Sequence, residues 1–339
     1  MLNPCPAGHC ATGHAFTEEQ ALSPADAAAN HVTAPEKCFL MVDDESRVVE
    51  GCLQPGTEEI RLVNKISPIK VFHSEEATLI GEVIWPVNCL YEPLCWTYNI
   101  REQTLNRHVF SNSSAVAKPV RQSHGFTAVG QNLVLYGGFG KTNWKRLENM
   151  VVYDTVSGAM TTQPLSHAEI TTPLCTVAVS DTEFVTVGFP SPQTARELPP
   201  DCVLSLEKHK LGSTEVTALP CAKGNVASGN RLECTADARF IYAKEVESST
   251  VWKFDLQSQE WIPSGILLVT KEHAYDQVVA NHLGMGVLDG NVYTFHSYLA
   301  QGTKHFFIIR VDEEGEPHSY PTTYSGVGFS TIKALIKKP

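Results

Sequence analysis

The chain has 339 residues, of which 42% are hydrophobic and 19% are charged, and its formal net charge is −11. This acidity disfavours binding to a nucleic-acid backbone or to an anionic membrane surface. The sequence also has no uninterrupted apolar run of about eighteen residues, which insertion across a bilayer would need.

Residues 1–36 are predicted to form a largely irregular tail, because they are rich in Ala, Pro and His and contain a single aromatic residue, Phe16. One short helix is allowed near residues 17–30. The tail has neither a secretory signal nor a transit-peptide pattern, so export is not expected. Its spacing C-x3-H-C-x3-H lacks the CxxC pairs of typical zinc sites, so no metal is expected there. The weak zinc candidates are Cys5, His9, Cys10 and His14.

Residues 37–339 are predicted to form one all-β domain. Short runs of Val, Ile, Leu, Phe and Tyr alternate with clusters of Gly, Pro, Asn, Asp and Ser, and helical periodicity is almost absent. Many short strands at regular spacing indicate a sandwich, a barrel or a propeller, and an internal repeat decides among them.

Such a repeat occurs in the middle of the chain. A turn joins two short predicted strands, and the second strand ends at a glycine pair, Gly137 and Gly138. After a long loop, a third strand ends at Tyr153 and Asp154. Met160 follows six residues after the Asp. This pattern resembles the kelch repeat, in which a Trp occupies the place of the Met.

The second half of the pattern recurs along the chain, most clearly in VWKFDLQSQEW, where Phe254, Asp255 and Trp261 take the equivalent positions. The six turn anchors are Asn64, Asn99, Asp154, Glu207, Asp255 and Asp312. Apart from one short interval, their spacing suits kelch units of about 50 residues. The resemblance therefore implies a six-bladed kelch-type β-propeller.

The two ends of residues 37–339 are expected to close this ring, because a propeller that stays open exposes unpaired sheet edges. The ending YSGVGFSTIKALIKKP resembles the first strand of a repeat, whereas KCFLMVDD reads as a second strand without a first. We therefore expect residues 324–336 to supply the innermost strand of the blade formed by residues 37–74.

The repeat residues are interpreted as structural. The Gly pair is expected where neighbouring sheets approach closely, and the aromatic repeat positions, with Trp96 and Tyr98, are expected to pack between blades.

Function is expected in the loops that join second to third strands, since strands are committed to packing. The longest of these loops are residues 137–149, 189–201 and 297–305. They carry residue types that are enriched at protein interfaces. The candidate protein-binding residues are Lys141, Trp144, Arg146, Arg196 and Tyr298. The alternative for Trp144 is a loop that folds back onto its own blade.

Enzyme signatures are weaker. Glu272, Asp276 and His282 resemble the iron site of plant nitrile-specifier kelch proteins, but that spacing would place the His at residue 280, which is Ala. Acid–base candidates at a central channel are His124, His167 and Glu169, although a histidine at a blade entry more often caps a turn. We expect no cofactor and no catalysis; the alternative is a propeller enzyme acting on a small molecule at the channel mouth.

The ten cysteines are scattered without regular pairing intervals, and several lie in apolar runs. This pattern predicts reduced thiols in a cytoplasmic setting. The resemblance implies an interaction scaffold that binds one or more proteins through one face, cytoplasmic or cytoskeleton-associated, as a subunit of a larger assembly.

Overall fold

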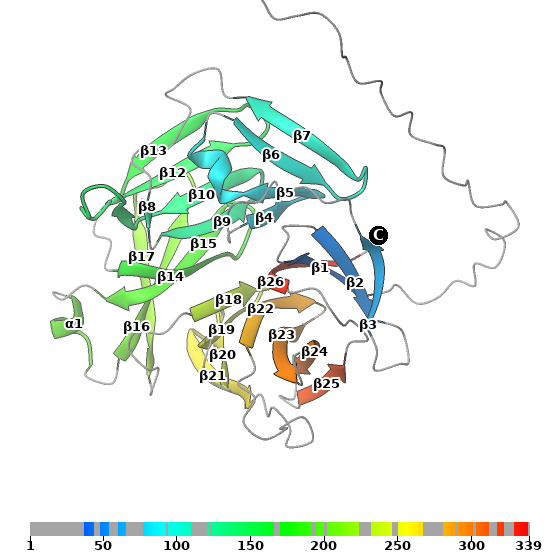
Figure 1. Cartoon of the computed structure of the whole chain (residues 1–339). Coiled ribbons are helices and arrows are strands. Elements are labelled where there is room, and N and C mark those ends of the chain that lie inside the picture. Colours follow the sequence, from blue (N-terminus) through cyan, green and yellow to red (C-terminus); the bar gives the residue numbers. More distant parts are fainter. Residues whose placement is uncertain are drawn as a thin grey trace, which may run out of the picture. The chain divides into compact units, whose positions relative to one another are not determined.

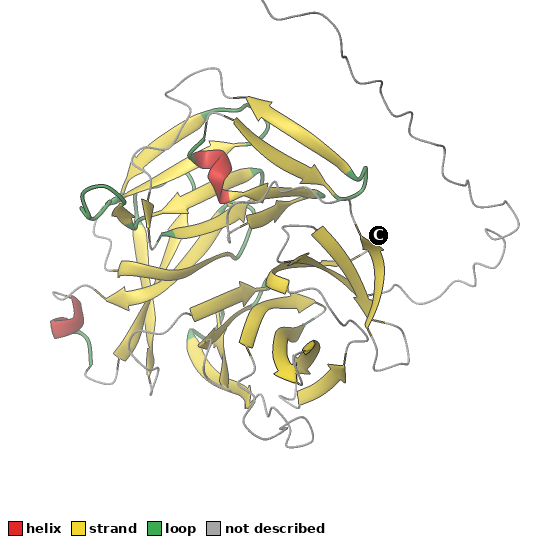
Figure 2. Ribbon diagram, in the orientation of Figure 1, coloured by secondary structure: helices red, strands yellow, loops and turns green. Residues whose placement is uncertain are grey.

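Strands make up most of the structure, a computed structural model, as Figure 2 shows. The structure describes residues 37–43, 48–53, 60–65, 77–92, 94–109, 121–122, 124–165, 170–190, 194–199, 202–223, 232–245, 250–266, 281–288, 290–300, 303–311, 317–321 and 329–337. Within these ranges the only helices are η1 (Val87–Leu90) and α1 (Thr194–Glu197). Neither is long and apolar enough to cross a membrane.

The chain divides into two units, Met1–Ala34 and Pro35–Pro339, and every described residue belongs to the second. The predicted tail, with Cys5, His9, Cys10 and His14, lies outside the described residues.

Five four-stranded antiparallel sheets follow one another along the chain, and each is named by its first strand (Figure 1). The β4 sheet contains β4 (Ala77–Ile80), β5 (Val83–Pro86), β6 (Leu94–Asn99) and β7 (Thr104–Val109). The β9 sheet contains β9 (Gly125–Val129), β10 (Asn132–Tyr136), β12 (Asn149–Asp154) and β13 (Met160–Pro164). The β14 sheet contains β14 (Ile170–Ala178), β15 (Glu183–Pro190), β16 (Cys202–Lys210) and β17 (Val216–Lys223).

The β18 sheet contains β18 (Leu232–Ala236), β19 (Phe240–Glu245), β20 (Thr250–Asp255) and β21 (Glu260–Ile266). The β22 sheet contains β22 (Asn281–Leu288), β23 (Asn291–Ala300), β24 (Thr303–Val311) and β25 (Pro317–Pro321). A further four-stranded sheet, the β26 sheet, joins β26 (Phe329–Lys337) to β1 (Lys37–Asp43), β2 (Val48–Leu53) and β3 (Ile60–Lys65).

The sheets take a β-propeller arrangement. Their first strands contact one another in chain order, from β4 to β9, β14, β18 and β22. Strand β26 contacts both β22 and β4. The all-β propeller predicted from the strand-and-turn pattern is therefore confirmed.

The C-terminal strand pairs with the region just after residue 37, as the sequence led us to expect. Strands β26 and β1 are antiparallel, with Cys38 opposite Ile336 and Lys37 opposite Lys337. The order β26-β1-β2-β3 corrects one anchor, because Asn64 lies in the outermost strand. The third strand of this sheet is β2, which ends at Leu53.

The predicted repeat positions occupy equivalent places in their sheets. Tyr153 lies opposite Met160, and Phe254 lies opposite Trp261. Their acidic neighbours open the same turn: Asp154 accepts the amides of Val156 and Ser157, and Asp255 accepts those of Gln257 and Ser258. The repeat thus recurs in side-chain register and in turn chemistry.

Neighbouring sheets pack through buried apolar side chains. Trp85, Leu133 and Tyr153 belong to one cluster of the β4 and β9 sheets, and Leu206 and Phe254 belong to one cluster of the β14 and β18 sheets. These contacts are the packing that the aromatic repeat positions predict. Trp96 is an exception and corrects the prediction: it points outward with 37% of its surface exposed, while Tyr98, two residues later, is buried.

Disulfides differ from the expected reduced thiols. Among the described residues, Cys89 bonds Cys95, Cys175 bonds Cys234, and Cys202 bonds Cys221. The second bond joins β14 to β18, the first strands of neighbouring sheets. Spacing along the chain gave no sign of these pairs, because they depend on which strands become neighbours.

Candidate functional site

The loop between β10 and β12, residues 137–149, forms a projecting hairpin that we call the tryptophan hairpin. It begins at Gly137 and Gly138, whose φ angles are +56° and +85°. A Cβ on Gly137 would meet Pro173 only at 3.4 Å, which is ordinary contact. Backbone conformation, rather than the expected close approach between sheets, therefore favours glycine at Gly137.

The base of the hairpin is held by a buried arginine on β8 (Arg121–Gln122). Arg121 donates hydrogen bonds to the carbonyls of Gly137 at 2.9 Å and Asn149 at 3.0 Å, and to the side-chain oxygen of Asn149 at 2.5 Å. Strand β8 also pairs with β11 (Phe139–Gly140), the first strand of the hairpin. Both ends of the loop are thus fixed by one guanidinium group.

The tip of the hairpin carries Trp144 in a fixed backbone conformation. The Trp144 amide donates to the Gly140 carbonyl at 2.8 Å, and the Gly140 amide donates to the Lys145 carbonyl at 2.9 Å. Trp144 has a φ of +55° and 67% of its surface is exposed. A left-handed conformation costs a non-glycine residue about 1 kcal/mol. The large apolar side chain is therefore presented to solvent by an ordered turn and is not folded back onto its blade.

The cationic residues of the hairpin divide into two kinds. Lys141 and Lys145 are exposed beside Trp144. Arg146 is half-buried instead: it donates to the carbonyl of Ile170 at 3.2 Å and lies 3.7 Å from the carboxylate of Glu148. Arg146 therefore serves mainly to brace the hairpin against the β14 sheet.

The other two predicted loops differ from each other. Arg196 lies on α1, in the loop between β15 and β16, and is exposed. Tyr298 does not lie in a loop, because β23 runs to Ala300 and β24 begins at Thr303. The long loop predicted at residues 297–305 is thus mostly strand.

A buried carboxylate under the tryptophan hairpin was missed as a site residue. Glu207 was expected at a turn, but it lies inside β16, which continues to Lys210, and its side chain is 0% exposed. The hydroxyl of Tyr136 donates to it at 2.5 Å, and the amide of Ile170 donates at 2.7 Å. Nε2 of His209 lies 3.4 Å from the same carboxylate. We call Tyr136, Ile170, Glu207 and His209 the Glu207 cluster.

The Glu207 cluster joins the β9 and β14 sheets. Burial by itself would raise the pKa of Glu207, but the nearby His209 and the hydrogen bonds from Tyr136 and the Ile170 amide outweigh it, so the pKa lies below the ordinary value. Burial, together with the neighbouring carboxylate, raises the pKa of Tyr136. The cluster therefore holds an anion hydrogen-bonded to a neutral phenol.

The cluster is also connected to the hairpin above it. Tyr136 directly precedes Gly137 in the chain. The backbone of Ile170 makes a hydrogen bond to each of them: its amide donates to Glu207, and its carbonyl accepts from Arg146 of the hairpin. The tryptophan hairpin, which carries the exposed Trp144, is therefore linked to the buried Glu207 cluster through Arg146 and Ile170.

Most of the remaining chemical candidates lie outside the described residues. His282 lies in β22, whereas Glu272, Asp276, His167 and Glu169 lie outside the described residues. His124 packs edge-on against Tyr91, with ring centroids 6.0 Å apart. Across the ranges that the structure describes, no three His, Cys, Asp or Glu side chains gather as a metal site.

Comparison with known proteins adds no assignment. No protein-family model matches the chain, and no curated protein matches it in sequence.

Proposed function

We propose that the chain is a six-bladed, kelch-type propeller that acts as an interaction scaffold and binds a protein partner through its second-to-third-strand loops. The observation that carries the proposal is the exposed Trp144 on an ordered hairpin. Propellers commit their strands to packing and present their loops for binding, and a preorganised aromatic side chain is the type of residue that anchors protein interfaces.

The blade count and the repeat type are parts of this proposal. Six four-stranded sheets in the described chain, with β26 between β22 and β4, support six blades. The kelch type is supported by the left-handed Gly137 and Gly138 after a second strand, and by the Asp154 and Asp255 turns after third strands.

The docking surface is defined as Lys141, Trp144 and Lys145, with Arg196 on the equivalent loop of the neighbouring sheet. All four side chains are exposed, and Lys141, Lys145 and Arg196 carry positive charge in a chain whose net charge is −11. Charge complementarity therefore favours a partner with an acidic rim around an apolar pocket that accepts the indole.

The same proposal places the protein in the cytoplasm, free or cytoskeleton-associated, as a subunit of a larger assembly and without catalytic activity. Disulfides ordinarily persist in oxidising compartments, so the location needs its own measurement. Alkylation of thiols at the moment of cell lysis, followed by fractionation, reports both the compartment and the state of the cysteines.

Affinity purification from the native source tests the docking surface with Trp144→Ala and a matched control, Val156→Ala. Val156 is also exposed and apolar, with 79% of its surface accessible, and it lies in the β12–β13 turn of the same sheet. We expect Trp144→Ala to weaken partner binding at least about thirtyfold, as hot-spot residues do, and Val156→Ala to leave it unchanged.

Circular dichroism and thermal unfolding check that both variants remain folded. If the folded Trp144→Ala variant retains every partner that the wild type retains, the hairpin is not the docking surface.

A further inference from the structure

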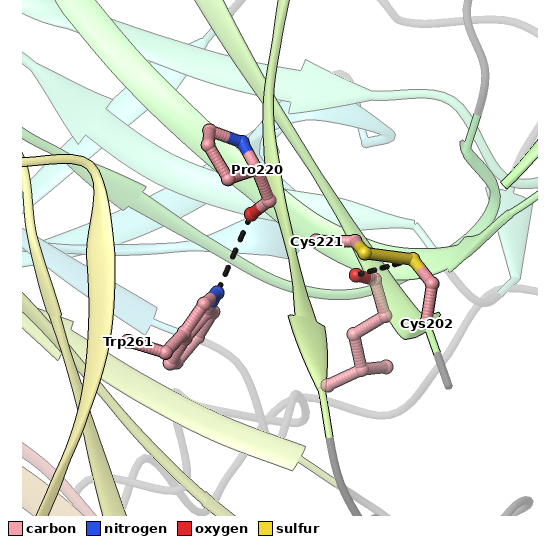
Figure 3. Close-up of a disulfide and its surroundings, with 5 residues drawn as sticks. Cys202, Pro220, Cys221 and Trp261 are labelled. Atoms are coloured by element: carbon pink, nitrogen blue, oxygen red, sulfur yellow. Dashed lines mark hydrogen bonds between the residues drawn. A yellow bond between two sulfur atoms is a disulfide. The ribbon is translucent and has the colours of Figure 1, made fainter. Parts of the chain in front are cut away.

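The disulfide between Cys202 and Cys221 lies at one end of the outer hairpin β16–β17, shown in Figure 3. The loop that contains α1 ends at Cys202, whose amide donates to the Pro199 carbonyl at 2.8 Å. Both cysteines are half-buried, and neither belongs to the apolar clusters that join the sheets. Reagents in solution therefore have access to this bond.

The backbone pairing is weakest at this end of the hairpin. Strands β16 and β17 pair regularly from His209, opposite Val216, towards Leu206, opposite Leu219, but the register shifts on both sides of Leu204. Pro220 lies in the irregular part and has no amide hydrogen to donate to the ladder. The disulfide therefore links β16 and β17 at the end where their backbone hydrogen bonding is least regular.

The disulfide Cys89–Cys95 is better protected than Cys202–Cys221. Cys89 and Cys95 are 0% and 1% exposed and lie within an apolar cluster. Cys175 and Cys234 pack against the apolar cluster of the β14 and β18 sheets, but they are half-buried, as Cys202 and Cys221 are. Exchange requires a thiolate to reach a sulfur atom, so the rate depends on access.

We propose that Cys202–Cys221 is a thiol–disulfide exchange site that a dithiol reductant opens before the buried bond Cys89–Cys95. The thiolate of the reductant attacks one cysteine sulfur, the S–S bond breaks, and a mixed disulfide forms. The second thiol of the reductant then attacks the reductant's own bound sulfur. Two electrons and two protons pass to Cys202 and Cys221, and the reductant leaves as a disulfide.

Reduction of Cys202–Cys221 is expected to affect a contact between the β14 and β18 sheets. The indole nitrogen of Trp261 on β21 donates to the carbonyl of Pro220, next to Cys221, at 3.4 Å (Figure 3). Trp261 also packs against Phe254, with ring centroids 5.2 Å apart. Release of the end of β17 therefore loosens a contact between the β14 and β18 sheets. This inference does not depend on the proposed docking surface.

Differential alkylation of the full chain tests the order of opening. The protein is treated with graded dithiothreitol, quenched with iodoacetamide and analysed by peptide mass spectrometry. We expect Cys202 and Cys221 to be alkylated at least about tenfold faster than Cys89 and Cys95, because of their greater access. Equal rates, or alkylation of Cys202 and Cys221 before any reductant is added, would overturn the proposal.

Hydrogen exchange tests the structural consequence. We expect amide exchange in residues 202–206 and 219–223 to rise on mild reduction, and to be high in Cys202→Ser/Cys221→Ser with or without reductant. The matched variant Cys175→Ser/Cys234→Ser should keep the reductant response in those peptides. Unchanged exchange after confirmed opening of Cys202–Cys221 would show that the bond does not control the hairpin.

Discussion

At the scale of single residues, the carboxylate of Glu207 is a buried anion at the joint between the β9 and β14 sheets. It is fully buried, and it is held by the Tyr136 hydroxyl and the Ile170 amide. A buried anion is tolerated only when hydrogen bonds replace its lost hydration. The cluster therefore fixes how the β9 and β14 sheets meet beneath the tryptophan hairpin.

Tyr136→Phe removes one hydrogen bond from this anion, and we expect it to lower the free energy of unfolding by about 1.5–3 kcal/mol. Glu207→Gln should also destabilise the protein and should change its pH dependence. The pKa of Glu207 is below its ordinary value of 4.5 in the folded protein. Its contribution to stability is therefore present above about pH 4.5 and is lost as the pH falls through the lowered value.

Urea unfolding of the wild type and Glu207→Gln between pH 3 and pH 7 provides the measurement, and the acid-dependent loss should be smaller in the variant. An exposed carboxylate in the turn between β16 and β17, Glu215, serves as the matched control for substitution by Gln. Identical pH profiles for the wild type and Glu207→Gln would contradict the role assigned to the cluster.

At the scale of elements, the turns between third and fourth strands share one geometry. The fourth residue after the turn-opening Asx is left-handed in three sheets: Gln103 follows Asn99, Gly158 follows Asp154, and Gln259 follows Asp255, with φ angles of +53°, +72° and +58°. Such a conformation costs L-residues about 1 kcal/mol. Glutamine occupies two of these positions, so the geometry of the turn outweighs the preference of an L-residue for negative φ.

The turn geometry predicts opposite effects for two substitutions. A Cβ on Gly158 would meet nothing within 4 Å, so Gly158→Ala should lower stability by about 1 kcal/mol through backbone strain alone. Gln259→Gly should be neutral or slightly stabilising, because relief of strain offsets the greater freedom of the unfolded chain. Denaturant midpoints measure both; destabilisation by Gln259→Gly equal to that by Gly158→Ala would refute the shared geometry.

At the scale of the whole molecule, covalent and polar links supplement apolar packing between sheets. The Glu207 cluster joins the β9 and β14 sheets, whereas Cys175–Cys234 joins the first strands of the β14 and β18 sheets. A disulfide stabilises chiefly by restricting the unfolded chain, and more so for a longer closed loop.

Removing Cys175–Cys234, whose cysteines are 59 residues apart, should therefore cost about 4 kcal/mol of unfolding free energy. Removing Cys202–Cys221, with a separation of 19, should cost about 3 kcal/mol. The two Cys→Ser double variants serve as controls for each other in urea unfolding. A Cys175→Ser/Cys234→Ser protein as stable as the wild type would show that this bond does not restrain the unfolded chain.

The sequence by itself was sufficient for the all-β class, the propeller arrangement, the equivalence of Tyr153–Met160 with Phe254–Trp261, and the pairing of the C-terminal strand after residue 37. These features follow from local patterns, namely alternating apolar runs, turn residues and a repeat, which a single chain displays directly. Loop length and residue type are local as well, and they marked Trp144 as a candidate, but they left open whether its side chain is exposed or folds back onto its blade.

Only the tertiary structure decided the Glu207 cluster, the bracing role of Arg146 and the disulfide partners. Each depends on contact between residues that lie on different strands or sheets. The hydrogen bond from Tyr136 to Glu207 spans 71 positions in the chain, and no local pattern encodes such a pair. Glu207 was expected at a turn because the repeat spacing requires one more anchor near it, but the structure places it inside β16, where donors from another strand and another sheet hold its carboxylate.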